Sequence, residues 1–191
     1  MSIKVLVTFA SRAGSTAEIA DVIAEQMLRS GCDADLQKMN RVVTLRPYDA
    51  VVLGAPLYAG HFPGEVRGFL LRHREPLSRL RPWLFALGPT RPEPDDYQAA
   101  RRQALDELAQ YSWFRPAELK IFGGRLSIEH LPFPYNLFRR MKDFPLKACD
   151  QRNWTEIRAW AQEAAGRLGV SALLFERPSN AMAVLAQTPK H

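Results

Sequence analysis

The sequence predicts a doubly wound α/β fold, in which helices cover both faces of a parallel sheet. Short apolar or β-branched runs alternate along the chain with longer segments whose apolar residues recur at helical spacing. One run, DAVVLGA at residues 49–55, is almost continuously apolar, which is typical of a strand buried on both faces. We therefore expect right-handed crossovers and a ligand crevice at the carboxyl ends of the strands.

Five strands are predicted from these runs. The first reads IKVLVTF, a β-branched segment that stops at small polar residues, and the fourth reads PWLFALG. The second is short. The predicted strands cover residues 3–9, 34–37, 49–55, 82–88 and 119–123.

Four amphipathic helices are predicted between and after the strands. The first has apolar residues at helical spacing from 19 to 28, with Ser15 or Thr16 as its N-cap and Gly31 as its stop. Two others are predicted over residues 96–113 and 154–168.

The remaining helix follows the third strand. Pro63 is expected to open it, because proline is well tolerated at a first helical position. Its apolar residues, Val66, Phe69, Leu70 and Leu71, are predicted to share one side.

Length and composition predict one globular domain with an insertion and a tail. The chain has 191 residues, of which 47% are hydrophobic and 24% charged, as in ordinary soluble proteins. Residues 1–169 are predicted to form the domain, with an insertion at 125–150, and residues 170–191 to form a tail that is partly disordered or loosely docked. The longest mostly apolar stretch, residues 48–59, is too short to span a bilayer.

Cysteine usage and charge indicate a compartment and a range of partners. Cys32 and Cys149 lie far apart without metal-ligand spacing, so neither a disulfide framework nor a metal site is expected. The start of the chain lacks the pattern of a secretory signal, and a cytoplasmic location is expected. The net charge of +6 favours anionic partners. Nucleic acid is not expected among them, because the cations are spread along the sequence and no binding motif is present.

The segment after the first strand has the composition of a phosphate-binding loop. Hydroxyl groups, a glycine and free amides at a helix start together form an anion cradle. A simpler alternative is that Ser15 or Thr16 only caps the helix. The segment matches neither a Walker loop nor GxGxxG, so ATP and NAD are not expected as the main ligand. The predicted binding residues are Ser11, Arg12, Ala13, Gly14, Ser15 and Thr16.

This loop resembles that of the flavodoxin family, which has the form Ser/Thr-x-Thr-Gly-x-Thr at the same junction. Ser11, Gly14 and Thr16 stand in the matching places. Ala13 replaces the middle threonine, which removes one side-chain hydrogen bond that Arg12 or Ser15 would have to supply. The resemblance implies a flavodoxin-like α/β/α fold, a five-stranded sheet in the order 2-1-3-4-5, and FMN held at its carboxyl edge.

Residues 1–169 also resemble the menaquinone-dependent, flavodoxin-like protoporphyrinogen oxidases. The matching segments read SRAGSTAEIA, GAPLYAGHFPGEVRGFL and WFRPAELKIFGGRL. The resemblance implies an FMN-dependent oxidoreductase, similar to a protoporphyrinogen oxidase with a quinone acceptor. It also implies that two further loops flank the flavin ring. Their residues are Pro56, Leu57, Tyr58, Ala59, Gly60 and His61 after the third strand, and Gly88, Pro89 and Thr90 after the fourth.

Three of these residues have expected roles that the resemblance implies. Tyr58 is expected to stack on or edge the ring, Gly60 to let a backbone carbonyl approach flavin N5, and His61 to stand at the rim. The alternative is that Tyr58 and His61 only close the end of the strand. No residue is assigned as catalytic, because the chain carries no nucleophile signature and the cofactor would supply the electron chemistry.

Residues 131–146, LPFPYNLFRRMKDFPL, interleave cations with aromatic and aliphatic side chains. This pattern favours a short helix on a membrane surface, at the inner face, or a grip on an apolar acidic molecule such as a quinone or porphyrin. The alternative is a proline-pinned loop whose aromatics pack on the domain. Two other functions also stay open: an electron-transfer protein with no small-molecule substrate, and a cofactor-free binding protein.

Overall fold

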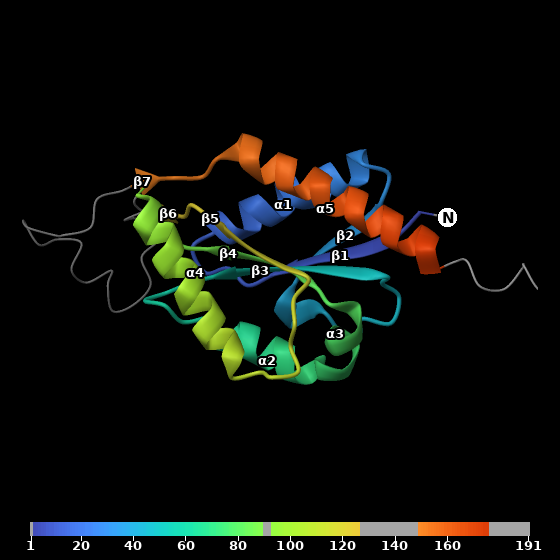
Figure 1. The fold of residues 1–191 in the computed structure, drawn as a ribbon, viewed down its shortest axis with the longest axis horizontal. Helices are drawn as coiled ribbons and strands as arrows, with labels where there is room; N and C mark the ends of the chain where they lie inside the picture. Colours follow the sequence, from blue (N-terminus) through green and yellow to red (C-terminus); the bar gives the residue numbers. More distant parts are fainter. Residues whose placement is uncertain (1, 90–92, 127–148, 176–191) are drawn as a thin grey trace, which may run out of the picture.

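A five-stranded parallel sheet forms the middle layer of the molecule (Figure 1). The computed structural model describes residues 2–89, 93–126 and 149–175, and of residues 126 and 170–175 it describes the backbone only. The strand order is β2-β1-β3-β4-β5, as the resemblance implied. Each strand lies within one residue of its predicted bounds. The strands are β1 (Lys4–Phe9), β2 (Asp33–Lys38), β3 (Ala50–Pro56), β4 (Trp83–Leu87) and β5 (Glu118–Phe122).

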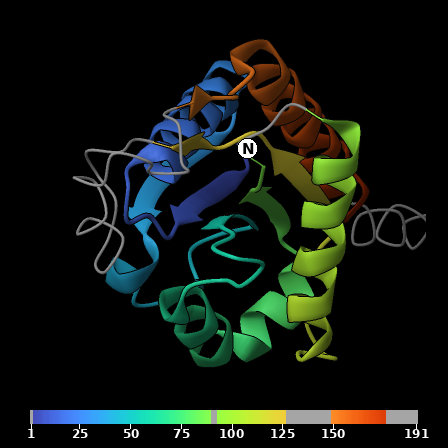
Figure 2. The ribbon, with the colours of Figure 1, turned by 90° about the vertical axis from the view of Figure 1, so that its left-hand side faces the viewer.

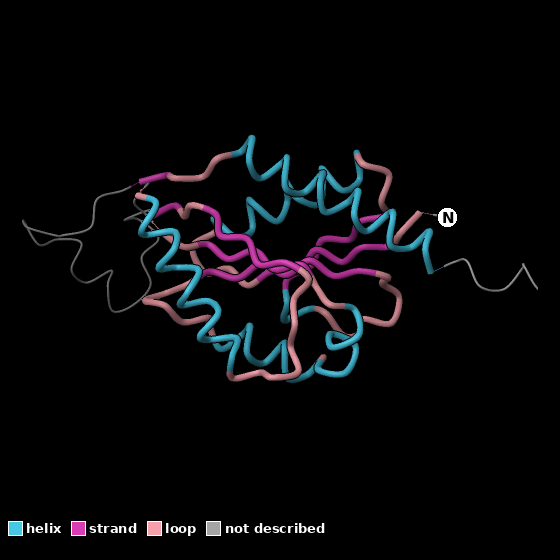
Figure 3. Tube along the Cα trace, viewed as in Figure 1, coloured by secondary structure: helices cyan, strands magenta, loops and turns pink. Residues whose placement is uncertain are grey.

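Helices cover both faces of this sheet, which gives the three layers seen in Figure 3. Those above the sheet in Figure 1 are α1 (Ser15–Arg29) and α5 (Trp154–Phe175). Those below it are α2 (Gly64–Arg72), α3 (Arg74–Leu80) and α4 (Pro94–Ala109). A short 3-10 turn, η1 (Met39–Arg41), follows β2.

The two apolar layers come from side chains that alternate along each strand. Val5 and Val7 pack with α1 and α5, whereas Leu6 between them packs with the helices on the other face. Every residue of β3 is buried. The continuous apolar run that predicted a doubly covered strand is therefore explained by its central position.

The ends of α1 show one wrong prediction and one confirmed. Ser15 and Thr16 are the first helical residues and neither caps the helix; Gly14 occupies the N-cap position with φ of 89°. The hydroxyl of Ser11 instead accepts a hydrogen bond from the Gly14 amide, at 3.1 Å. At the other end, Gly31 has φ of 88° and ends the helix as predicted.

The other helices differ from their predicted extents. Leu71 is 56% exposed, because it follows Leu70 directly and so points about 100° away from the buried face of α2. The short helix α3 was not predicted. The predicted 96–113 helix in fact starts at Pro94 and ends at Ala109, where turns place Tyr111 and Phe114 against the core.

The last helix and the insertion extend beyond the simple pattern. α5 continues past residue 169 to Phe175, so the first residues of the predicted tail are helical. The described ends of the insertion form a two-stranded antiparallel stem, β6 (Arg125–Leu126) with β7 (Cys149–Asp150). Residues 131–146 lie outside the described residues. Within the described ranges, no helix combines the length and the apolar character needed to cross a membrane.

Candidate functional site

The loops that follow β1, β3 and β4 meet at the carboxyl edge of the sheet, which Figure 2 views from that side. The chain passes from β1 to the edge strand β2 and then returns to β3 on the other side of β1. This change of direction is a topological switch point, the usual place for a ligand crevice in open α/β sheets. The site is built from these loops.

The loop after β1 presents backbone amides at the start of α1. The first intrahelical hydrogen bond runs from the Glu18 amide to the Gly14 carbonyl, at 3.1 Å. The amides of Ser15, Thr16 and Ala17 precede that bond and have no carbonyl within the helix to accept from them. The left-handed backbone of Gly14, at φ of 89°, turns the loop into the helix. This arrangement suits an anion.

The loop after β3 closes as a two-residue turn. Tyr58 and His61 exchange backbone hydrogen bonds of 3.0 Å, and Ala59 and Gly60 between them both have positive φ, at 49° and 84°. Positive φ at both central residues defines a type I′ turn, in which alanine is strained and glycine is not. The loop is tied to the next strand by the bond from the Leu57 amide to the carbonyl of Leu87, at 2.9 Å.

A carboxylate of α4 holds the far side of this turn. Glu107 Oε1 lies 2.7 Å from Nδ1 of His61, and the Phe62 amide donates to Oε2 at 3.4 Å. The hydrogen bond with His61 lowers the pKa of Glu107, with smaller help from the Phe62 amide and against the effect of burial. The Glu107 side chain is 12% exposed and that of His61 is 74% exposed. His61 is thus attached to α4 while its own ring stays largely exposed.

Tyr58 connects the turn to the phosphate loop. Burial raises the pKa of its phenol, and hydrogen bonding to the Arg12 backbone together with the Arg12 charge acts in the opposite direction. The phenol therefore lies beside Arg12, while the residue as a whole remains 37% exposed. The contact between Tyr58 and Arg12 therefore joins the loop after β3 to the loop after β1.

A cavity of about 360 Å³ opens between the β3 and β4 loops and the first half of α4. This volume lies near the lower end of the range for small-molecule sites. Five of the residues predicted to flank a flavin line it, together with four residues of α4. The lining consists of Leu57, Ala59, Gly60, Gly88, Pro89, Asp96, Ala99, Ala100 and Gln103.

The other predicted residues lie elsewhere. Pro56 is the buried last residue of β3, and Tyr58 and His61 flank the turn outside the cavity lining. The phosphate loop, residues 11–16, is also outside that lining. Thr90 lies outside the described residues.

The cavity walls form where the backbone of the loop after β4 lies very close to α4 and to the end of β5. A Cβ on Gly88 would lie 2.7 Å from Cβ of Ala100, so only glycine lets α4 pass this near. The Gly88 amide donates to the Phe122 carbonyl, and the Gly124 amide donates to the Pro89 carbonyl, each at 3.0 Å. Hydrogen bonds with the end of β5 and the residues after it therefore hold the loop after β4 in place.

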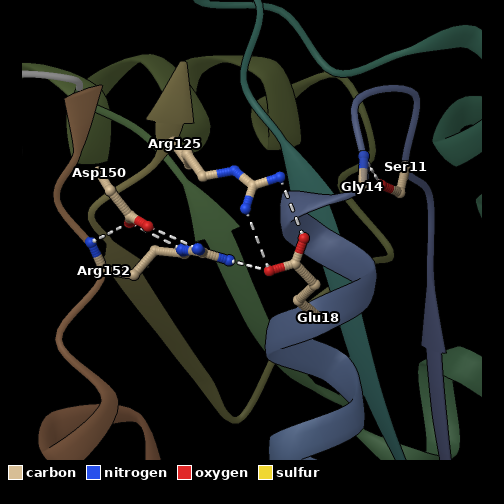
Figure 4. A network of polar contacts seen from close by, with 6 residues as sticks. All are labelled: Ser11, Gly14, Glu18, Arg125, Asp150 and Arg152. Atoms are coloured by element: carbon tan, nitrogen blue, oxygen red, sulfur yellow. Dashed lines mark hydrogen bonds and ion pairs between the residues drawn. The ribbon is translucent and has the colours of Figure 1, made fainter. Parts of the chain in front are cut away.

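Four charged residues form a network beside the phosphate loop, which we call the Glu18 cluster: Glu18, Arg125, Asp150 and Arg152 (Figure 4). Arg152 lies 2.5 Å from Oε2 of Glu18 and 2.5 Å from Oδ2 of Asp150. Arg125 lies 3.2 Å from Oε1 of Glu18. The Arg152 side chain is only 5% exposed, and its hydrogen bond holds the pKa of Asp150 below its usual value.

Several of these residues were not predicted from the sequence. Asp96, Ala100, Gln103 and Glu107 recur at spacings of three or four, so one face of the α4 segment is small and polar where a core face would be apolar. That pattern is a local signal that could have identified them. The Glu18 cluster has no such signal, because Glu18 and Arg152 are separated by 134 positions.

Comparisons with known proteins agree with this architecture. A family model described as flavodoxin domain matches residues 6–141. Protoporphyrinogen IX dehydrogenase [quinone] of Escherichia coli K12 is 25% identical over 125 residues, which cover 64% of this chain and 69% of that protein. The Leishmania major protein of the same name is 28% identical over 142 residues, covering 72% of this chain and 59% of that one.

Solved flavodoxins have the same fold at low identity. A point mutant of the flavodoxin from Pseudomonas aeruginosa aligns with a TM-score of 0.56 and 15% identity, covering 87% of this chain and 99% of that one. Flavodoxin 2 of Bacillus cereus aligns with a TM-score of 0.54 and 20% identity, covering 88% and 99%.

Proposed function

Because the chain belongs to the flavodoxin domain family, we propose that it binds FMN at the carboxyl edge of its sheet and works as an oxidoreductase. The observation that carries the proposal is the pairing of two features at that edge. One is a helix start with free amides and a left-handed glycine, and the other is a cavity between the next two loops.

The first feature suits the phosphate of FMN. Amides at the start of α1 donate toward an anion, and the positive end of the helix dipole favours a negative charge there. Gly14 contributes its backbone freedom, since a side chain at φ of 89° is strained. Riboflavin, which lacks the phosphate, would not use this loop, so the loop favours FMN over the unphosphorylated flavin.

The second feature suits the ring. The cavity wall combines small residues, such as Gly60, Gly88 and Ala99, with the backbone of the type I′ turn. Small side chains let a flat aromatic group lie close to the main chain. Asp96 and Gln103 supply the polar groups of the wall.

Bound FMN supplies the transfer of electrons and hydrogen, and the protein supplies position and electrostatics. The loop after β1 binds the phosphate, the turn at residues 58–61 orients the ring edge, and the β4 loop excludes water from one side. Glu107 keeps that turn in place through His61 and Phe62.

We further propose that the electron acceptor is a quinone and that the substrate is a reduced porphyrin precursor. The support is the similarity to proteins named protoporphyrinogen IX dehydrogenase [quinone]. Each oxidation of the porphyrin precursor would remove two electrons and two protons from it, and the quinone would accept them. A quinone dissolved in a membrane would place the protein at the inner face of that membrane, where a basic chain is attracted.

Binding is tested by incubating the purified chain with FMN, desalting it, and recording its visible spectrum. We expect flavin bands near roughly 375 and 450 nm to remain. Gly14→Ala should lose them, whereas Gly31→Ala should retain them. Both glycines have positive φ, at 89° and 88°, and stand at opposite ends of α1, so the second variant controls for backbone strain.

Function is tested separately on protein that has retained FMN. Oxidation of protoporphyrinogen with reduction of a soluble menaquinone analogue would support the substrate proposal. Reduction by a protein donor without turnover of either small molecule would instead identify an electron-transfer protein. A colourless chain that retains no FMN would overturn the redox proposal and leave the fold unchanged.

A further inference from the structure

We infer that Arg125 tunes the affinity of the phosphate loop by neutralising Glu18, and that it thereby couples the stem of the insertion to cofactor binding. The inference rests on the proposed function, because it concerns the same phosphate. Arg125 acts through Glu18 and is a positioning residue rather than a ligand.

The geometry puts a negative charge beside the proposed phosphate site. Glu18 lies in the first turn of α1, and a Cβ built on Gly14 would lie 3.8 Å from its Oε1 atom. The carboxylate thus lies next to the glycine that turns the loop. A carboxylate is itself stabilised at a helix start, so it uses the same positive potential that a phosphate would use.

Two guanidinium groups offset that charge. Arg152 contacts Glu18 at 2.5 Å and Arg125 contacts it at 3.2 Å (Figure 4). Arg152 also pairs with Asp150, and its guanidinium stacks on the ring of Trp154, 4.6 Å from the centroid. Arg152 is therefore held by several contacts, while Arg125, 30% exposed, pairs within the described residues with Glu18 alone. The cluster holds two carboxylates and two guanidinium groups, and its formal charge is zero.

Loss of Arg125 would leave this cluster with a net negative charge next to the phosphate loop. Charges at partly exposed sites still interact across a few ångströms, and a phosphate near pH 7 carries more than one negative charge. The affinity for FMN would then fall because Arg152, which pairs with both Glu18 and Asp150, cannot by itself neutralise the two carboxylates. The affinity for riboflavin would not change, since it brings no phosphate.

The cluster also connects distant parts of the chain. Arg125 belongs to β6 and Asp150 to β7, the two strands of the stem from which residues 127–148 emerge. A Cβ on Gly123 would lie 2.1 Å from the carbonyl oxygen of Gln151, so the two sides of the stem meet by direct backbone contact. A shift of Arg125 with the stem would therefore alter the potential at the phosphate loop.

A double-mutant cycle tests the inference on the full chain, with dissociation constants for FMN and riboflavin measured by quenching of flavin fluorescence. Arg125→Gln should weaken FMN binding about tenfold and leave riboflavin binding within about twofold. Glu18→Gln should bind FMN as tightly as the original chain or more tightly. The double variant, in which the cluster is neutral again, should recover to within about threefold of the original affinity.

Arg29→Gln is the matched control. It removes the same charge and breaks the exposed Arg29–Glu25 pair at the far end of α1, about 20 Å along the helix, so FMN affinity should not change. The tenfold loss should shrink as salt is raised.

Other results would overturn the inference. Equal loss of riboflavin and FMN affinity in Arg125→Gln would indicate general distortion of the site. A double variant as weak as Arg125→Gln would mean that Arg125 contacts the phosphate directly. If the original chain binds neither flavin, it is the proposed function that fails.

Discussion

Gly54 illustrates how one position without a side chain sets the packing of the sheet. It lies opposite Phe85 in the register of β3 and β4. A Cβ added to Gly54 would lie 2.3 Å from Cζ of Phe85, and the two other nearest atoms are also in that ring. The ring is completely buried and has tilted or edge contacts with Phe122 and Trp160. It therefore has little room to move aside.

We predict that Gly54→Ala lowers the free energy of unfolding by about 2 kcal/mol or more, the usual cost of overpacking a well-filled core. Gly68→Ala is the control, because Gly68 is exposed in α2 and a Cβ there meets no atom within 4 Å. That change should stabilise the protein by about 0.5–1 kcal/mol through helix propensity. Urea unfolding of both variants measures the two effects. If both variants change the free energy of unfolding by the same small amount, Gly54 is not required for the packing of Phe85.

At the scale of elements, the contact between α4 and the type I′ turn positions the proposed ring site. The turn contains a strained residue, Ala59, and its closing residues bond to each other by backbone groups. Glu107 is the side chain of α4 that bonds to it, through His61 and Phe62. The ionised form of Glu107 is the favoured one, since its pKa is lowered mainly by the hydrogen bond with His61.

We predict that Glu107→Gln loosens the turn without unfolding the domain. Hydrogen exchange at the Tyr58 and His61 amides should accelerate about tenfold, because a charge-assisted bond becomes a neutral one. Asp106→Asn, an equal change of charge at the exposed neighbouring position, should leave those rates unaltered. Unchanged exchange in both variants would mean that the backbone bonds alone hold the turn.

At the scale of the whole molecule, His73 links global stability to pH. It stands between α2 and α3, is 5% exposed, and its Nε2 atom has no hydrogen-bond partner among the described residues. Burial lowers its pKa, the charge of Arg72 adds to this, and a bond to the Val42 backbone acts in the opposite direction. The folded state thus holds His73 neutral at a pH where an unfolded histidine already takes up a proton.

This difference in protonation decides whether stability rises or falls with pH. Below about pH 6.5 the unfolded chain binds a proton at this residue that the folded chain does not yet bind, so stability falls as the pH falls. The slope from one such residue is at most about 1.4 kcal/mol per pH unit. We predict that His73→Leu flattens the pH dependence of the free energy of unfolding just below about pH 6.5, measured by urea denaturation. If the variant keeps the same slope of unfolding free energy against pH as the original chain, other groups cause the pH dependence.

Much of the fold was predictable because its signals are local. Each strand is a short apolar or β-branched run, and all five predicted strands lie within one residue of the observed bounds. The stop of α1 at Gly31 was likewise predictable, since a left-handed glycine after a helix is recognisable from its neighbours. Helix limits were predicted less well where tertiary packing decides them, as at the end of α4.

The sequence by itself determined the α/β class, the strands and the composition of the loops, because periodicity, glycine placement and β-branched runs act over a few residues. Only the tertiary structure decided which residue of α4 holds the turn and which arginines pair with Glu18. These features join positions far apart along the chain, such as His61 with Glu107 and Glu18 with Arg152. Their partners become neighbours only after the sheet has formed, since each contact depends on strand order and helix position rather than on local pattern.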